Sequence, residues 1–273
     1  LILGTVQFGI PYGTTYYKKK KLNNKIINSI LKNCKSKISI LDTAEDYNLS
    51  VLTKKKFNKF IVNTKVNIDL FKRSETQVIN YFKKISKFYN IDVLFVRSLE
   101  NKYRDIKIFN IIKKLKDFKL IKRLGISVYS FENVKKLHKN LHYDVIQLPS
   151  NIFDNRSDKY QKFFEKKFIE VHARSVFLQG AIFLKKDNFN YKSTFKNTEL
   201  NKFLDFCQKK SLDKYDLALS HVFNKKYIDK IIVGVHNKVQ LNHILKFKQN
   251  NNTQFLKRFN SNNLKLIDPR KWK

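Results

Sequence analysis

The feature that most constrains the fold is the regular alternation of short apolar runs with amphipathic segments along the 273 residues. Runs of a few residues rich in Ile, Val, Leu and Phe are typical of buried strands. The segments between them repeat apolar residues at helical spacing, as at 24–34, where Ile26, Ile27, Ile30 and Leu31 share one face. The predicted strands lie at 1–8, 38–41, 60–66, 91–96, 123–128, 145–148, 168–176 and 231–235.

Helical spacing recurs between these strands often enough to indicate the fold class. Eight strands with intervening helices are typical of an α/β fold, a (β/α)8 TIM barrel, although a doubly wound open sheet has the same local pattern. The chain shows no linker rich in Pro, Gly or Ser and no internal repeat, so we predict a single domain over residues 1–273. The predicted helices lie at 24–34, 75–89, 105–118, 130–141, 198–222 and 237–247.

The chain is strongly basic, with 57 Lys and Arg against 22 Asp and Glu and a net charge of +35. Such a charge favours polyanions, anionic membrane surfaces or phosphorylated substrates. The lysines are scattered over nearly every segment, which indicates a background composition with lysine on solvated faces. We therefore do not expect a nucleic-acid partner, and polyanion or RNA binding stays as a third alternative.

Cysteine usage and hydropathy indicate the compartment. Cys34 and Cys207 are far apart and form no CxxC pair, so neither a disulfide framework nor a zinc site is predicted, and no metal is expected. No run approaches the roughly 18 apolar residues that span a bilayer, and the N-terminus lacks the layout of a signal peptide. These features predict a cytoplasmic protein that does not bind membranes.

Polar residues follow the predicted strands at the points where the strands end. In a barrel these ends face one mouth, where chemistry is expected. Each residue also has a structural interpretation: Asp42 could cap a helix, Lys65 could extend from its strand to solvent, and Tyr47 could pack in a wall. The strand-end residues are Asp42, Lys65, Arg97, Ser127, Gln147, Asn151, Arg174, Ser175, Gln179, His236 and Asn237.

The combination of Asp42, Tyr47 and Lys65 is more specific than any one of them. Tyrosine has an ordinary pKa of about 10, which a nearby ammonium group lowers by stabilising the phenolate. A carboxylate would keep that lysine charged and in position. Such a tyrosine can protonate a developing alkoxide near neutral pH, so the three residues together predict a proton donor.

The chain resembles the aldo-keto reductases over nearly its whole length. The opening and closing segments look most like reductases associated with bacterial surface-polysaccharide and sugar-nucleotide pathways. The motifs that carry the resemblance are "LGTVQFGIPYG", "LDTAEDY", "NTKV", "IDVLFV", "LGIS", "DVIQLPSNIFDNR", "RSVFLQG", "IIVGVHNKVQL" and "IDPRKW".

The resemblance implies roles for individual residues. Asp42, Tyr47 and Lys65 would be three members of the catalytic tetrad, with Tyr47 as general acid and Arg97 at the fourth position. Gln147 would hold the nicotinamide carboxamide, and the cofactor would bind in the barrel mouth without a GxGxxG motif. We expect NADP(H) rather than NAD(H). The cofactor-binding residues implied are Ser127, Gln147, Arg174, Ser175, Gly234, His236, Lys238 and Gln240.

Three positions depart from the family pattern. The fourth catalytic residue, usually histidine, is Arg97; a Ser-Asn pair reads Ser127-Val128; and a common glutamate is replaced by Val51. A guanidinium group stays charged and only donates hydrogen bonds, so Arg97 is expected to lower the pKa of Tyr47 further.

These features predict a reductase that acts on an aldehyde or ketone with NADP(H) and takes a small-molecule carbonyl substrate. A sugar-derived substrate, phosphorylated or nucleotide-linked, would fit the resemblance. The alternative is a nucleotide-binding barrel with weakened or no catalysis, because Arg97 stands at the histidine position. The natural substrate, the reaction direction and the oligomeric state stay open at this point.

Overall fold

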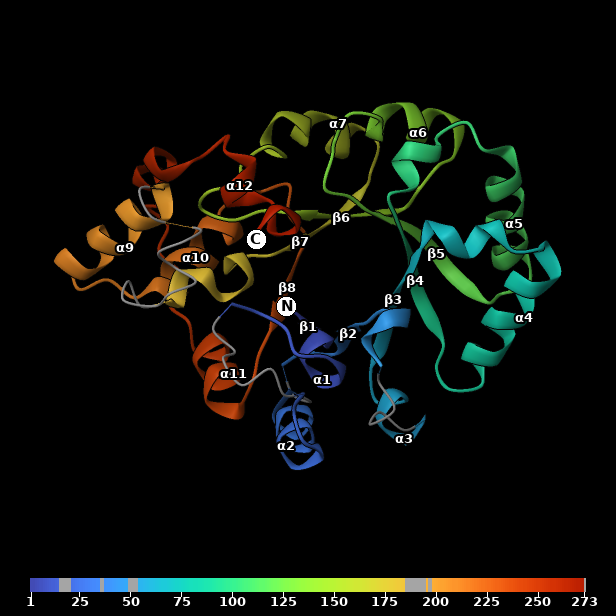
Figure 1. Ribbon diagram of the computed structural model, residues 1–273, viewed down its shortest axis with the longest axis horizontal. Helices are drawn as coiled ribbons and strands as arrows, with labels where there is room; N and C mark the ends of the chain where they lie inside the picture. The colour runs from blue at the N-terminus through green and yellow to red at the C-terminus, as the bar shows by residue number, and fades with distance from the viewer. Residues whose placement is uncertain (15–20, 35–36, 49–53, 185–194, 196–197, 273) are drawn as a thin grey trace.

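The computed structural model describes residues 1–14, 21–34, 37–48, 54–184, 195 and 198–272, and its eight strands form a closed parallel barrel (Figure 1). Strand β1 pairs with β2 on one side and with β8 on the other, where Leu3 lies opposite Val233. This closure confirms the predicted (β/α)8 barrel, because an open sheet would leave two edges unpaired. The strands are β1 (Ile2–Gly4), β2 (Ile40–Asp42), β3 (Ile61–Asn67), β4 (Ile91–Arg97), β5 (Ile121–Ser127), β6 (Val145–Pro149), β7 (Glu170–Arg174) and β8 (Lys230–Gly234).

Helices surround the strands and bury their apolar faces against them (Figure 1). Among the described residues, no helix is long and apolar enough to cross a membrane. The α-helices are α1 (Val6–Gly9), α2 (Asn24–Cys34), α3 (Lys54–Phe57), α4 (Glu75–Ser86), α5 (Ile106–Asp117), α6 (Val134–Asn140), α7 (Gln161–Lys166), α9 (Glu199–Lys209), α10 (Lys214–Phe223), α11 (Lys238–Leu245) and α12 (Leu264–Ile267). The 3-10 helices are η1 (Glu45–Tyr47), η2 (Ile68–Lys72), η3 (Leu99–Lys102), η4 (Asp158–Tyr160), η5 (Leu178–Phe183), η6 (Gln254–Phe259) and η7 (Pro269–Lys271).

Two predicted elements differ from the structure in kind or number, whereas others, such as the helix expected over 130–141, which is Val134–Asn140, differ only at their ends. The strand expected over 1–8 ends at Gly4, and Val6–Gly9 forms the short buried helix α1, because a short, mostly apolar run does not distinguish a strand from a buried helix. The helix expected over 198–222 is two helices, α9 and α10. Ser211 between them adopts a left-handed φ of 52°, and the Asp213 side chain caps α10 by accepting from the Asp216 amide.

The N-terminal end of the barrel is closed by charged side chains. Arg123 donates to Asp92 at 2.7 Å and to Glu170 at 2.6 Å, and Lys230 donates to Glu170 at 2.5 Å. Nearer to the C-terminal ends of the strands, the Phe95 ring fills the barrel interior beside Gly125, where a Cβ atom would lie 2.4 Å from the ring. The C-terminal end is therefore the open one, as expected for a barrel of this class.

Candidate active site

A cavity of about 500 Å³ opens at the C-terminal ends of the strands. Of the predicted site residues, all except Lys238 line it. Lys238 is exposed at the start of α11, and Asn151 and Asn237, which also follow strands, lie outside the lining. Val51 lies outside the described residues. The predicted residues that the barrel brings together are Asp42, Tyr47, Lys65, Arg97, Ser127, Gln147, Arg174, Ser175, Gln179, Gly234, His236 and Gln240.

A buried polar group lies at the bottom of this cavity. The Lys65 ammonium group donates to Asp42 Oδ2, and Gln147 Nε2 donates to Asp42 Oδ1 at 2.8 Å. All three residues are almost inaccessible to solvent. Burial lowers the pKa of Lys65, and the Asp42 charge opposes this. Asp42 therefore fixes the ammonium group and the Gln147 amide in place.

Tyr47 lies above this group in η1, which follows β2. Its position depends on close packing, since a Cβ atom at Gly9 would come within 1.4 Å of the Tyr47 carbonyl oxygen. The residue after it, Asn48, adopts a left-handed φ of 47°, which asparagine tolerates better than most residues. The Lys65 ammonium group lies 5.5 Å from the centroid of the Tyr47 ring.

Arg97 lowers the pKa of Tyr47 as predicted, but the expectation that this pKa lies below its ordinary value is wrong. Burial raises the pKa of Tyr47 above its ordinary value and the Asp42 charge adds to the effect, while Arg97 opposes it. Desolvation of the phenolate outweighs the attraction of the cations. Tyr47 is therefore a fully protonated phenol at neutral pH.

Arg97, at the end of β4, forms a two-point ion pair that the sequence did not indicate. Its two terminal nitrogens donate to Asp46 at 2.8 and 2.9 Å. Burial disfavours the guanidinium charge, but the hydrogen bonds from Arg97 to Asp46 and Tyr47 raise the pKa of Arg97. Arg97 lies at the cavity wall as a fixed cation, 6.0 Å from the Tyr47 ring centroid.

The wall beyond Gln147 is formed by the ends of β5 and β7. Ser127 Oγ donates to Gln147 Oε1 at 3.5 Å. Arg174 donates to the Val128 carbonyl oxygen at 2.9 Å and to Ser175 Oγ at 3.3 Å. Val128 is buried and accepts this bond from Arg174 with its backbone carbonyl oxygen.

The other end of the cavity is formed by β1 and β8. His236 Nε2 donates to the Tyr12 carbonyl oxygen at 3.0 Å, and the His236 amide donates to Gln240 Oε1 at 2.7 Å. Gly234 leaves room for the Gln7 amide, which a Cβ atom would approach to 2.4 Å. Gln7 Oε1 is buried and accepts no hydrogen bond from any described residue.

Several residues of the cavity were not among the predicted site residues. Gln7, Tyr12, Tyr129 and Arg270 all line it. Gln7, Tyr12 and Arg270 lie within motifs that carry the family resemblance, "LGTVQFGIPYG" and "IDPRKW", so the motifs could have indicated them. Tyr129 lies two residues after the end of β5, where no local pattern marks it.

Comparisons with known proteins agree with this architecture. The model of the Aldo/keto reductase family matches residues 1–260, whereas no curated protein matches the chain. An aldo-keto reductase from Bacillus halodurans (AKR11C1, holo form) is similar in structure, with a TM-score of 0.72 and 16% identity over 100% of this chain and 95% of the other. The glycerol dehydrogenase AKR11B4 from Gluconobacter oxydans has a TM-score of 0.66 and 16% identity, covering 98% of this chain and 92% of the other. The chain therefore belongs to the aldo/keto reductase family, whose members are nicotinamide-dependent carbonyl oxidoreductases.

Proposed function

We propose that the protein reduces an aldehyde or ketone to an alcohol with a nicotinamide dinucleotide, and that Tyr47 is the general acid. The observation that carries this proposal is the buried Asp42–Lys65 pair beside Tyr47 in the barrel mouth. A buried ion pair costs free energy unless both groups are well satisfied, and here Gln147 satisfies the second carboxylate oxygen. Such a group at the end of an open cavity supports a catalytic role.

The residues of the cavity fit a dinucleotide. Its volume is in the range of small-molecule sites, and the unsatisfied Gln7 Oε1 can accept a hydrogen bond. Gln147, Arg174 and Ser175 would hold the nicotinamide end, and His236 and Gln240 the phosphate and adenosine end. When bound, the dinucleotide supplies the hydride.

The preferred cofactor, the compartment and the kind of substrate follow from the resemblance to the family and from the composition of the chain. NADP(H) is preferred over NAD(H) because the protein is basic; Lys238, which is exposed outside the cavity lining, adds support only if the cofactor extends along α11. The protein works in the cytoplasm on a small carbonyl compound, and the opening and closing segments favour a sugar-derived one.

Three side chains of the site control the transfer of the Tyr47 proton. Asp42 keeps Lys65 in place, and Lys65 stabilises the phenolate that forms when Tyr47 gives its proton to the carbonyl oxygen. The raised pKa of Tyr47 keeps that proton available throughout the neutral range. Arg97 can only donate a hydrogen bond, so it can position the carbonyl oxygen but cannot take part in proton exchange as an imidazole could.

One observation favours a second candidate function, a nucleotide-binding barrel without turnover. Asp46 occupies both terminal nitrogens of Arg97 through the bonds at 2.8 and 2.9 Å, which leaves fewer donors for a carbonyl oxygen. Titration of the protein with NADPH and NADH by cofactor fluorescence, followed by a panel of aldehydes and ketones, separates the two. Binding without turnover selects the second candidate, and absence of binding rejects both.

Substitution Tyr47→Phe tests the assignment of the acid. Because only the transferable proton is lost, turnover is expected to fall by about 100- to 10,000-fold while NADPH binding is retained. Tyr143→Phe is the matched control, since Tyr143 is also buried but donates to the Val134 carbonyl outside the cavity; it should retain turnover. Equal activity of Tyr47→Phe and the wild type would show that another group is the acid.

A further inference from the structure

An aromatic ring on the cavity wall is shared by two arginines from distant parts of the chain. The guanidinium carbons of Arg174 and Arg270 each lie 3.9 Å from the centroid of the Tyr129 ring. Arg174 ends β7, whereas Arg270 comes from η7 in the closing segment. All three residues line the cavity. Contacts at this distance are cation–π interactions, so the ring holds both cations at one place.

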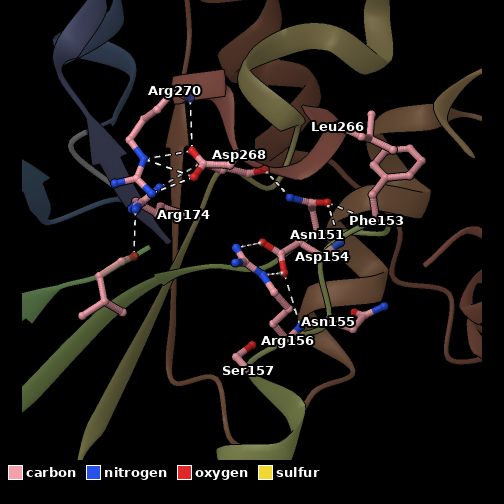
Figure 2. A network of polar contacts seen from close by, with 12 residues as sticks. Asn151, Phe153, Asp154, Asn155, Arg156, Ser157, Arg174, Leu266, Asp268 and Arg270 are labelled. Carbon is pink, nitrogen blue, oxygen red and sulfur yellow. Dashed lines mark hydrogen bonds and ion pairs between the residues drawn. The ribbon is translucent and has the colours of Figure 1, made fainter. Parts of the chain in front are cut away.

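Asp268 binds one side of the Arg270 guanidinium group, which leaves some of its N–H donors available for a ligand. Arg270 donates from Nε to Asp268 Oδ1 at 2.9 Å and from Nη2 to Asp268 Oδ2 at 2.6 Å, and Figure 2 shows this fork. Asp268 is itself buried. Among the described contacts, none uses Nη1 of Arg270. The fork therefore fixes the orientation of the guanidinium plane without occupying all of its donors.

The charges along the cavity wall do not balance. Lys65, Arg97 and Arg270 each have a carboxylate partner, in Asp42, Asp46 and Asp268. Arg174 forms no ion pair with any described residue and is bound by a carbonyl and a hydroxyl oxygen instead. Glu100 is buried and acts electrostatically on both arginines, but no ion pair joins it to either within the described part of the chain. Two cations at one ring with a single paired carboxylate favour an added anion.

The two arginines and Tyr129 line the same cavity as Tyr47. Arg174 acts electrostatically on Tyr47 and on Tyr12, both on the cavity wall. A molecule whose carbonyl oxygen meets Tyr47 can therefore extend a second group along the cavity wall toward the Tyr129 ring.

We propose that Arg174, Tyr129 and Arg270 form a subsite for an oxyanion of the substrate, so that the carbonyl compound carries a carboxylate or phosphate group. This inference rests on the proposed reductase function, in which Arg174 also borders the nicotinamide end of the cofactor and so would lie between the cofactor and the substrate anion. Guanidinium groups match both oxyanions through paired hydrogen bonds, so the shared chemistry is anionic oxygen. Asp268 is a positioning residue, because it acts only through Arg270.

The test compares matched pairs of aldehydes. Succinic semialdehyde is set against butanal, and glyceraldehyde 3-phosphate against glyceraldehyde, with kcat/KM measured for each. We expect the wild type to prefer the anionic member of at least one pair, and the pair that shows the preference identifies carboxylate or phosphate. Arg270→Met should reduce that preference by about 10- to 100-fold, the usual effect of a charge-assisted hydrogen bond. Arg270→Lys, which keeps the charge but loses the fork, should lie between the two.

Two controls make the result decisive. Lys271→Met removes one exposed positive charge from the same segment and should leave the preference unchanged, which separates the subsite from the general basicity of the protein. Calorimetric titration with 4-hydroxybutyrate provides a readout that needs no turnover, and its binding should weaken in Arg270→Met.

If the wild type reduces both members of each pair equally, or if Arg270→Met changes only the affinity for NADPH, there is no substrate oxyanion subsite. If no aldehyde is reduced, the reductase proposal fails and the calorimetric comparison alone decides on the subsite, with wild-type binding by Arg270→Met overturning it.

Discussion

At the scale of single residues, Glu100 shows how burial sets the ionisation of a group beside the site. It is 2% exposed, and its Oε2 atom has no hydrogen-bond partner among the described residues. Burial raises the pKa of Glu100 from 4.5 to about 7, although Arg270 and Arg174 favour the charged form. Between about pH 4.5 and pH 7, Glu100 therefore keeps its proton in the folded protein, whereas the unfolded chain has released it.

This shift predicts a dependence of stability on pH. Between about pH 4.5 and pH 7 the unfolded chain binds fewer protons at this group than the folded protein, so the free energy of unfolding falls as the pH rises through that range. The effect amounts to about 3 kcal/mol. Glu100→Gln should remove this fall and stabilise the protein at pH 8, as measured by urea unfolding at several pH values. Glu132→Gln, an exposed control, should behave as the wild type; a pH dependence unchanged in Glu100→Gln would contradict the assignment.

The Arg97–Asp46 pair predicts opposite shifts of the Tyr47 pKa. Arg97 lowers this pKa and Asp46 raises it. Asp46→Asn leaves the Arg97 charge unopposed, so the pKa of Tyr47 should fall by roughly one unit, while Arg97→Met should raise it. Ultraviolet titration of tyrosinate measures the shift, with the same variants in a Tyr47→Phe background subtracting the other tyrosines. Shifts of the same sign in both variants would show that the pair does not act through charge.

At the scale of elements, the packing of α1 against η1 sets the position of Tyr47. Gly9 in α1 lies so close to η1 that a Cβ atom would be 1.4 Å from the Tyr47 carbonyl oxygen and 2.8 Å from that of Asn48. Both are backbone atoms, so no side-chain rotation can relieve the contact. A substitution at Gly9 must therefore move the segment that carries the general acid.

Gly9→Ala is expected to reduce turnover by about 100-fold, because a displacement of about 1 Å at a reacting group has effects of that size. Circular dichroism should show that the barrel is retained. Gly4→Ala is the matched control, since its nearest contact is the Ile232 side chain at 3.3 Å, and its loss should be much smaller. Similar losses in both variants would mean that the barrel end as a whole, rather than the α1–η1 contact, is sensitive.

At the scale of the whole molecule, the net charge of +35 is spread around the barrel. Exposed lysines occur on the outer helices, for example Lys25 on α2, Lys83 on α4, Lys113 on α5 and Lys135 on α6. Charges distributed in this way attract polyanions weakly and from all sides. At physiological salt the Debye length is about 8 Å, so such attraction is largely screened.

Retention on heparin and on RNA should therefore be weak and should disappear by about physiological salt. A salt series of column retention and filter binding measures this. Sequence-selective retention of RNA at physiological salt would instead support polyanion binding as the function.

The sequence by itself was enough for the class of fold and for most of the candidate site. Periodicity depends only on near neighbours along the chain, so it located all eight strands and most helices, and the residues at the strand ends followed from the barrel geometry. It could not decide that Val6–Gly9 is a helix, since the apolar run fits either state and packing against η1 selects one. It could not show that Asp46 binds Arg97, or that Arg174 and Arg270 meet at Tyr129. Nor did it give the direction of the Tyr47 pKa shift, which burial decides. These features depend on groups far apart in sequence and on the exclusion of water, and only the closed barrel establishes both.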